Sequence, residues 1–181
     1  MISAIRSACS STLIIAVLLS LSSCATVPDS QSTANVPAAI GPYPDFSGRL
    51  IVIEPKRRWQ VLLKWQAETA EQGKVRLTHA ATNKVVELQW QDKQIQVRDN
   101  KHPDWQIIGQ QKLTELGIVL PLQQLANILL GNIPAHFKHK NNNTWESRQT
   151  GSLIRLHWQA NRQKLSMTDL KHGRQATLFV D

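Results

Sequence analysis

The sequence predicts a mainly β fold with a few helices, in which short antiparallel strands follow one another along the chain. Two observations predict it. Most of the chain from residue 46 onward consists of short runs in which apolar and polar side chains alternate, which is typical of strands with one buried face. A single interruption, residues 110–130, instead spaces its apolar side chains by three and four, as an amphipathic helix does.

The predicted strands begin with residues 47–53, a run rich in Ile, Leu and Val. In the next strand, WQVLLKW, the alternation puts four apolar side chains on one face: Trp59, Val61, Leu63 and Trp65. In KVVELQW the same alternation aligns Val86, Leu88 and Trp90. Further strands are predicted at residues 74–79, 93–98, 152–158, 164–170 and 176–180. Polar turns such as TNK, QDK and ANRQ separate these runs, so we expect an antiparallel meander.

The interruption predicts two helices. QQKLTELG predicts a short helix that places Leu113 and Leu116 inward and ends at Gly117. In LPLQQLANILLG, Pro121 occupies the first helical position and Gly131 stands just past the end. The apolar stripe of this second helix consists of Leu122, Leu125, Ile128 and Leu129. Such a stripe needs a cover, and we expect the concave face of a curled sheet to supply it, either packed solid or around a cavity.

The first 23 residues have the three parts of a secretory leader: a positive charge at Arg6, an apolar run at residues 12–21, and small residues before Cys24. The apolar run is short for a membrane-spanning helix, which needs roughly 20 residues. The order Leu-Ser-Ser-Cys resembles a bacterial lipobox, in which the cysteine receives a diacylglycerol, the leader is cut before it, and the new amine is usually acylated. The alternative is an ordinary cleaved signal peptide with a chance cysteine.

We therefore expect Cys24 to be a lipid anchor, since two or more acyl chains hold a protein stably on a bilayer. Ala25 rather than aspartate follows it, which resembles the signal for sorting to the outer membrane. The other cysteine, Cys9, leaves with the leader, so no disulfide is expected in the mature protein. The lipidated cysteine and a Pro-rich flexible tether occupy residues 24–45, and residues 46–181 form one globular domain.

The net charge of +8 is concentrated in that domain. A basic body on a membrane is drawn to anionic headgroups or steers an acidic partner. Nucleic acid is not an expected partner, because the leader directs the chain elsewhere and no RNP, zinc-finger or helix-turn-helix signature is present.

Catalytic motifs are absent from the sequence: it has no Gly-x-Ser-x-Gly, His-Glu-x-x-His or Cys-x-x-Cys motif and no phosphate-binding glycine loop. His136 and His139 are spaced by three, but they lie in a polar stretch without a neighbouring acid, so we interpret them as loop histidines. No enzyme activity, metal or cofactor is expected. The six tryptophans either fill a small core or line a cavity for lipid.

The motifs together resemble the LolB family of outer-membrane lipoprotein receptors. The resemblance rests on the lipobox cysteine, the Pro-rich tether, the GRL strand at residues 48–50, the strand ending in KWQ at residues 64–66, and above all LPLQQLANILLG. It implies a half-open barrel formed by a curved antiparallel sheet, with helices covering an apolar cavity. It also implies a function: accepting triacylated lipoproteins from the periplasmic carrier LolA and inserting them into the inner leaflet of the outer membrane. The protein would then be lipid-anchored, face the periplasm and use no cofactor. One cavity per tethered body makes a monomer the simplest expectation.

On this resemblance the acyl chains of the cargo lie against strand and helix side chains. The expected lining is Trp59, Val61, Leu63, Trp65, Val86, Leu88, Trp90, Leu122, Leu125, Ile128 and Leu129. Family members often carry a protruding leucine between the third and fourth strands, implicated in membrane insertion. In an ungapped alignment that loop position falls on Asn83, after Thr82. The second helix also has Ile128 where tryptophan is frequent.

Two other interpretations remain open. In the first, the fold is the same but its core is packed, and the protein is a membrane-tethered scaffold for envelope assembly. In the second, the protein is a periplasmic hydrolase, which would require a cluster of acid and base groups that the sequence does not reveal.

Overall fold

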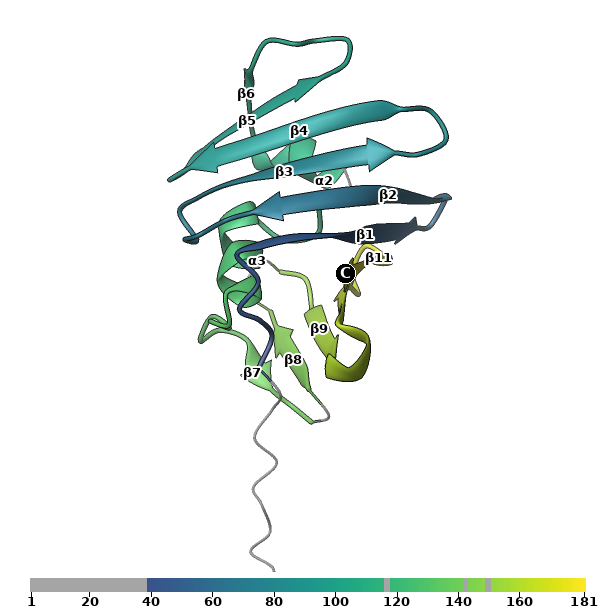
Figure 1. Ribbon diagram of the computed structural model, residues 1–181. Helices are drawn as coiled ribbons and strands as arrows, with labels where there is room; N and C mark the ends of the chain where they lie inside the picture. Colours follow the sequence, from purple (N-terminus) through teal and green to yellow (C-terminus); the bar gives the residue numbers. More distant parts are fainter. Residues whose placement is uncertain (1–38, 116–117, 142, 149–150) are drawn as a thin grey trace, which may run out of the picture. The chain divides into compact units, whose positions relative to one another are not determined.

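A computed structural model describes residues 39–181 except 116–117, 142 and 149–150. The described residues form one antiparallel sheet in the order β6-β5-β4-β3-β2-β1-β11-β10-β9-β8-β7 (Figure 1). The first six strands are β1 (Asp45–Glu54), β2 (Arg57–Gln66), β3 (Gln72–His79), β4 (Lys84–Gln91), β5 (Gln94–Asp99) and β6 (Gln106–Ile108). The remaining five are β7 (Lys138–His139), β8 (Thr144–Ser147), β9 (Ile154–Gln159), β10 (Lys164–Asp169) and β11 (Arg174–Val180).

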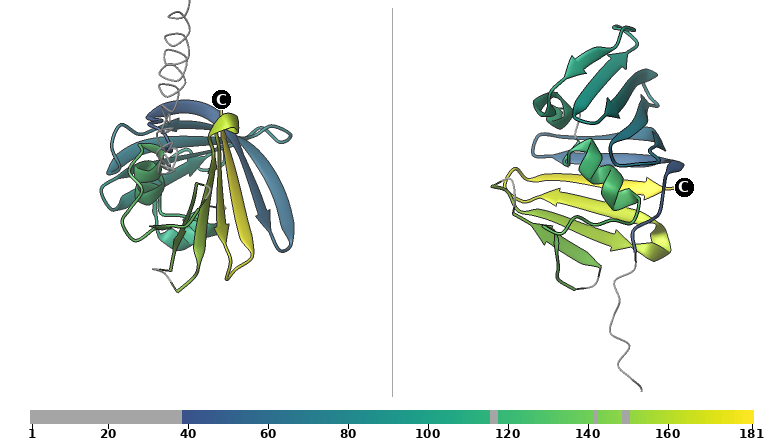
Figure 2. Two further views of the ribbon diagram at one scale, coloured as in Figure 1. Left: turned by 90° about the horizontal axis from the view of Figure 1, so that it is seen from below. Right: turned by 90° about the vertical axis from the view of Figure 1, so that its left-hand side faces the viewer.

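The sheet is curved and unclosed. The first strand pairs with the last, Gly48 facing Val180 and Ile53 facing Gln175, while β6 and β7 form the two free edges. This pairing brings the amino-terminal and carboxy-terminal meanders into one surface, which curves around the helices (Figure 2). The structure thus confirms the predicted mainly β fold and the half-open barrel.

Alternation along β2 shows how the sequence determines the two faces. Val61, Leu63 and Trp65 are buried on the concave side, whereas Leu62 between them is 49% exposed. The same period of two recurs in β3, β9 and β10. Because a slip by one residue would expose every inward side chain, this alternation also fixes the register of the strands.

Two helices cover the concave face: α2 (Gln110–Glu115) and α3 (Leu122–Leu129). Helix α3 lies across the strands in Figure 2. It begins after Pro121, which is the N-cap residue rather than the first helical residue, and Gly131 follows its end with φ of +93°. Its apolar stripe is buried, namely Leu122, Leu125, Ala126, Ile128 and Leu129. Full burial of a leucine stabilises by about 1.5–3 kcal/mol, so the stripe holds the helix on the sheet.

Three short strands were not predicted from the sequence. β6, β7 and β8 contain few residues, and β7 consists only of Lys138 and His139, both exposed. Their strand character comes from pairing with a neighbour, as when Lys138 faces Glu146 and His139 faces Trp145. The prediction that His139 lies in a loop was therefore wrong, because its backbone pairs with β8.

The chain is already packed against the body before the predicted domain boundary at Phe46. Ile40 is fully buried, and the backbone N–H of Tyr43 donates to the carbonyl of Leu129 at the end of α3 over 2.7 Å. The described part of the expected tether therefore belongs to the fold. The leader, Cys24 and the rest of the tether lie outside the described residues, as do Leu116 and Gly117 at the predicted end of the first helix.

Candidate functional site

A small apolar cavity lies between the concave face of the sheet and the helical cover. Its volume is about 30 Å³, roughly twice the 10–15 Å³ that a cavity needs to hold one water molecule. The sheet contributes Leu50, Leu63, Trp65, Val75, Leu77, Met167, Ala176 and Leu178. The cover contributes Ile118, Val119, Leu120, Leu122 and Leu125. Every lining side chain is apolar, so the cavity suits hydrocarbon and offers nothing to a charged ligand.

One side of the cavity is closed by residues 118–120, which connect the two helices and which we call the cover segment. Ile118 and Leu120 are buried, and Val119 is half-buried. The N–H of Ile118 donates to the carbonyl of Leu113 over 3.1 Å. Within the described part of the chain, the N–H groups of Val119 and Leu120 have no backbone partner. Among the described residues, the contacts that hold the segment are therefore mainly apolar.

The structure brings only some of the predicted lining residues to this cavity. Leu63, Trp65, Leu122 and Leu125 border it. The others lie in the surrounding core: Val61, Leu88, Trp90, Ile128 and Leu129 are buried, and Trp59 and Val86 are half-buried against that core.

Sequence reasoning missed lining residues from four strands, Leu50, Val75, Leu77, Met167, Ala176 and Leu178, and from the cover segment. Their inward parity was visible in the sequence. The sequence did not reveal the pairing of β1 with β11, which brings the last two strands to the cavity.

The tryptophans serve both packing and lining. The Trp65 ring, which borders the cavity, stacks on Phe46 with centroids 6.3 Å apart and lies 5.2 Å from the Trp90 centroid. The Trp90 indole N–H donates to the carbonyl of Ala70 over 3.0 Å. In the described residues the indole N–H groups of Trp59, Trp65 and Trp158 are buried without a partner, each at a cost of about 1–3 kcal/mol.

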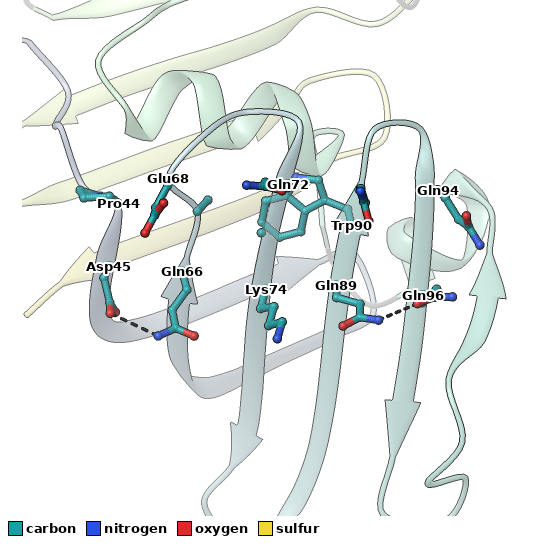
Figure 3. Close-up of a pocket in the computed structure, with 13 residues that line it drawn as sticks. Pro44, Asp45, Gln66, Glu68, Gln72, Lys74, Gln89, Trp90, Gln94 and Gln96 are labelled. Carbon is teal, nitrogen blue, oxygen red and sulfur yellow. Dashed lines mark hydrogen bonds between the residues drawn. The ribbon is translucent and has the colours of Figure 1, made fainter.

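A larger hollow of about 690 Å³ lies beside the ends of β1 to β5, and most of the residues that line it are polar (Figure 3). One row of side chains crosses five strands: Asp45, Gln66, Lys74, Gln89 and Gln96. Two contacts join members of the row, Gln66 to Asp45 at 3.3 Å and Gln89 to Gln96 at 2.6 Å. Of the predicted residues only Trp90 borders this hollow. Its amide-rich wall does not suit acyl chains.

The predicted membrane-insertion loop is the four-residue turn between β3 and β4. Thr82 and Asn83 are exposed, and Asn83 has a left-handed φ of +51°. The Thr82 hydroxyl lies 3.1 Å from His79 Nδ1. The Asn83 carbonyl accepts a hydrogen bond from the Asn100 side chain at 3.5 Å. The turn is thus exposed and internally bonded, and it carries no large apolar side chain.

Comparison with known families settles the relationship of the chain. A family model described as "Outer membrane lipoprotein LolB" matches residues 45–173, from the first residue of β1 to the turn before β11. The chain belongs to the LolB family. No curated protein sequence matches it. Membership supports a role in lipoprotein localisation at the outer membrane, as the sequence motifs indicated.

Among the described residues of this LolB-family chain, no helix is long and apolar enough to cross a membrane. In the same part of the chain, no three His, Cys, Asp or Glu side chains lie close enough together to hold a metal ion. His136 contacts Gln124 of α3 through its Nε2 atom, so this loop histidine fastens the segment after α3 to the helix.

One polar cluster that sequence reasoning missed lies at the turn between β10 and β11. Asp169, only 8% exposed, accepts hydrogen bonds from the Ser152 hydroxyl and from the backbone N–H of Lys171, and pairs with His172 Nδ1 at 2.7 Å. Burial alone would raise the pKa of Asp169, but the hydrogen bonds from Ser152 and His172 and the charge of His172 outweigh it and lower that pKa.

Ser152 and His172 therefore share one carboxylate, and the serine hydroxyl bonds to the acid and not to the imidazole. A nucleophilic serine needs a base as its hydrogen-bond partner. This arrangement instead orders the turn and one wall of a neighbouring pocket.

Proposed function

We propose that this protein accepts acylated lipoproteins from a LolA-like periplasmic carrier and inserts them into the inner leaflet of the outer membrane. One observation carries the proposal: a cavity with a wholly apolar lining lies beneath α3 and the cover segment, in a chain of the LolB family. The proposal includes removal of residues 1–23, anchoring through lipid on Cys24, a monomeric periplasm-facing body, and no enzymatic step.

The energetics of such a transfer require a receiver of this kind. Burying acyl chains is worth about 0.8 kcal/mol per CH₂, so a chain of about 16 carbons loses on the order of 12 kcal/mol when it enters water. Direct passage from one apolar cavity to another avoids that loss. Transfer then needs only a receiver with higher affinity than the donor and a bilayer with higher affinity still.

The cavity must open before it can hold an acyl chain, because about 30 Å³ is far too small for one. Movement of α3 and the cover segment away from the sheet would expose the inward side chains of β2, β3, β10 and β11. Such a movement would break the hydrogen bond from the Ile118 N–H to the Leu113 carbonyl and expose Ile118 and Leu120. Acyl chains in the opened cavity would cover that apolar surface again.

The small volume also suits the alternative of a membrane-tethered scaffold with a packed core. The two functions differ in one measurable respect, because a scaffold has no reason to open and retain lipid.

A transfer assay tests the proposal. The soluble form beginning at Ala25 is mixed with a lipoprotein-loaded periplasmic carrier, and the two proteins are separated to see which holds the cargo. We expect the cargo to move to this protein. Retention by a carrier that readily releases the same cargo to another LolB-family receptor would overturn the proposal and favour the scaffold.

A further inference from the structure

A second pocket, of about 240 Å³, adjoins the apolar cavity on the other side of the cover segment. The residues Ile118, Val119 and Leu120 line both spaces. If the cover segment shifts, the pocket and the cavity become one continuous space. Unlike the cavity, the pocket has a polar wall, to which Gln124, His136, Ser152, Asp169, His172 and Arg174 contribute. We call it the polar pocket.

The polar wall contains two acids, and both have partners. Asp169 accepts hydrogen bonds from Ser152 and from two backbone N–H groups, and it pairs with His172. The other acid, Glu54, forms ion pairs with Arg57 and, at 3.8 Å, with Arg174. Basic side chains therefore offset the negative charge of both carboxylates.

The available hydrogen-bond donor is Arg174. Its side chain is one-third exposed, and the nearest acidic atom among the described residues is Glu54 Oε1, 3.8 Å from Nε. That distance is too long for a hydrogen bond. A guanidinium has five N–H groups and no acceptor, so in the described part of the chain Arg174 keeps N–H donors beyond its long ion pair with Glu54, and it lines the polar pocket next to an apolar wall.

His136 and Gln124 stand on the same wall, where the Gln124 side-chain amide contacts Nε2 of the imidazole. Donors on one wall and apolar side chains on the other fit a group that carries only acceptors and is attached to hydrocarbon.

We propose that the polar pocket binds the ester carbonyl oxygens of a diacylglyceryl group whose acyl chains enter the apolar cavity, with Arg174 as the principal donor. The inference rests on the proposed function, because it requires the cavity to admit acyl chains. Two sources carry this group: the lipid-modified cysteine of a lipoprotein and a membrane phospholipid.

The test compares ligands that differ only in the two carbonyls. A synthetic S-diacylglyceryl-cysteine peptide and its dialkyl ether analogue have the same chains, but the ether lacks the carbonyl acceptors. Phosphatidylglycerol and its diether form the second pair. Binding of each ligand to the soluble form from Ala25 is measured by displacement of a fluorescent fatty acid. We expect the wild-type protein to bind the diester about tenfold or more tightly than the diether, as expected for a hydrogen bond to a charged group.

The variant Arg174→Gln should lose this preference while its affinity for the diether stays unchanged, which also shows that the variant is folded. Arg174→Lys keeps the charge and should retain part of the preference. The matched control is Arg155→Gln, because Arg155 pairs with Glu146 at 2.7 Å and borders neither space; it should behave as wild type.

The outcomes separate the two proposals. Equal affinity for diester and diether in the wild-type protein overturns the role of the polar pocket and leaves lipid binding intact. Failure to bind any of the four ligands overturns the proposed function itself. A preference found with the cysteine peptide assigns the polar pocket to cargo, and a preference found only with phosphatidylglycerol assigns it to membrane lipid.

Discussion

The backbone N–H of Tyr43 donates to the carbonyl of Leu129 over 2.7 Å, which fastens the segment before the sheet to the last residue of helix α3. Ile40, three residues earlier, is fully buried. The chain that leads toward the proposed membrane anchor therefore contacts the element that covers the cavity. Any movement of α3 away from the sheet must break this contact or carry the segment with it.

This contact depends on Gly41. Its φ of +93° is left-handed, and a Cβ atom built on it would lie 2.1 Å from the Leu129 carbonyl oxygen. We predict that Gly41→Ala lowers the free energy of unfolding by about 1–3 kcal/mol from backbone strain alone, and by more if the helix end cannot shift. Chemical denaturation measures the loss.

The matched control is Gly109→Ala, since a Cβ at residue 109 meets nothing within 4 Å. This variant should be close to wild type in stability. Equal stability of the two variants would contradict the structural role of Gly41.

A second prediction compares two buried leucines of α3. Leu125 borders the cavity, whereas Leu129 is fully buried and does not. Leu125→Ser and Leu129→Ser should each lower the free energy of unfolding by at least the roughly 2–5 kcal/mol of a large-to-small core substitution. Only Leu125→Ser should also weaken binding of a fluorescent fatty acid, by about tenfold, because it puts a hydroxyl into the lining. Equal affinity in both variants, at a temperature where both are folded, would show that the cavity does not hold the chain.

The difference between these leucines illustrates what the sequence could predict. The spacing of three and four identified the buried stripe of α3 correctly, and Pro121 and Gly131 marked its ends to within one residue. Periodicity assigns a side chain to a face, but it does not say which part of the opposite sheet that face meets. Leu129 was therefore predicted to line the cavity, but it does not border the closed cavity, and its backbone carbonyl accepts a hydrogen bond from Tyr43 before β1.

The same limit applies to Ser152, Asp169 and His172. Each is unremarkable in the sequence, because no motif spans the turns that bring Ser152 to the carboxylate of Asp169. Likewise, the alternation of apolar and polar residues predicted both β1 and β11. It did not predict that they pair, because this pairing joins the two ends of the domain. Local pattern specifies the elements, whereas long-range pairing assembles the site.

A third prediction concerns Asn83, the exposed residue of the β3–β4 turn. Asn83→Leu would place an apolar side chain at the tip of the turn and should increase binding to phospholipid vesicles in a flotation assay. The substitution should also lower the free energy of unfolding by about 1 kcal/mol or more, because the left-handed φ of +51° suits asparagine better than leucine. Asn83→Gly is the control: it relieves the backbone without adding apolar surface, so vesicle binding should not rise. A rise with glycine would point to turn flexibility as the cause.

The last prediction follows from the lowered pKa of Asp169. A carboxyl group with a lower pKa in the folded state stabilises the protein fully above its ordinary value of 3.8 and loses that contribution as the pH falls through the folded-state value. Asp169→Asn removes the charge opposite His172, so at pH 7 we expect a loss of about 1–3 kcal/mol. The difference in the free energy of unfolding between wild type and variant should then narrow as the pH falls below 3.8.

Denaturation curves at several pH values between 7 and 2.5, roughly spanning the ordinary carboxyl range, measure this difference. The comparison variant is Asp99→Asn, because Asp99 begins a turn with the same kind of hydrogen bonds. Its carboxylate accepts from the backbone N–H groups of Lys101 and His102 and lies 3.1 Å from His102 Nδ1. The pKa of Asp99 is also lowered, chiefly by the hydrogen bond from the His102 backbone. At this exposed turn solvent screens the charges, so the loss should be smaller than at Asp169. If the stability difference between wild type and Asp169→Asn stays constant with pH, the charge on the carboxylate does not stabilise the β10–β11 turn, and its packing and geometry do.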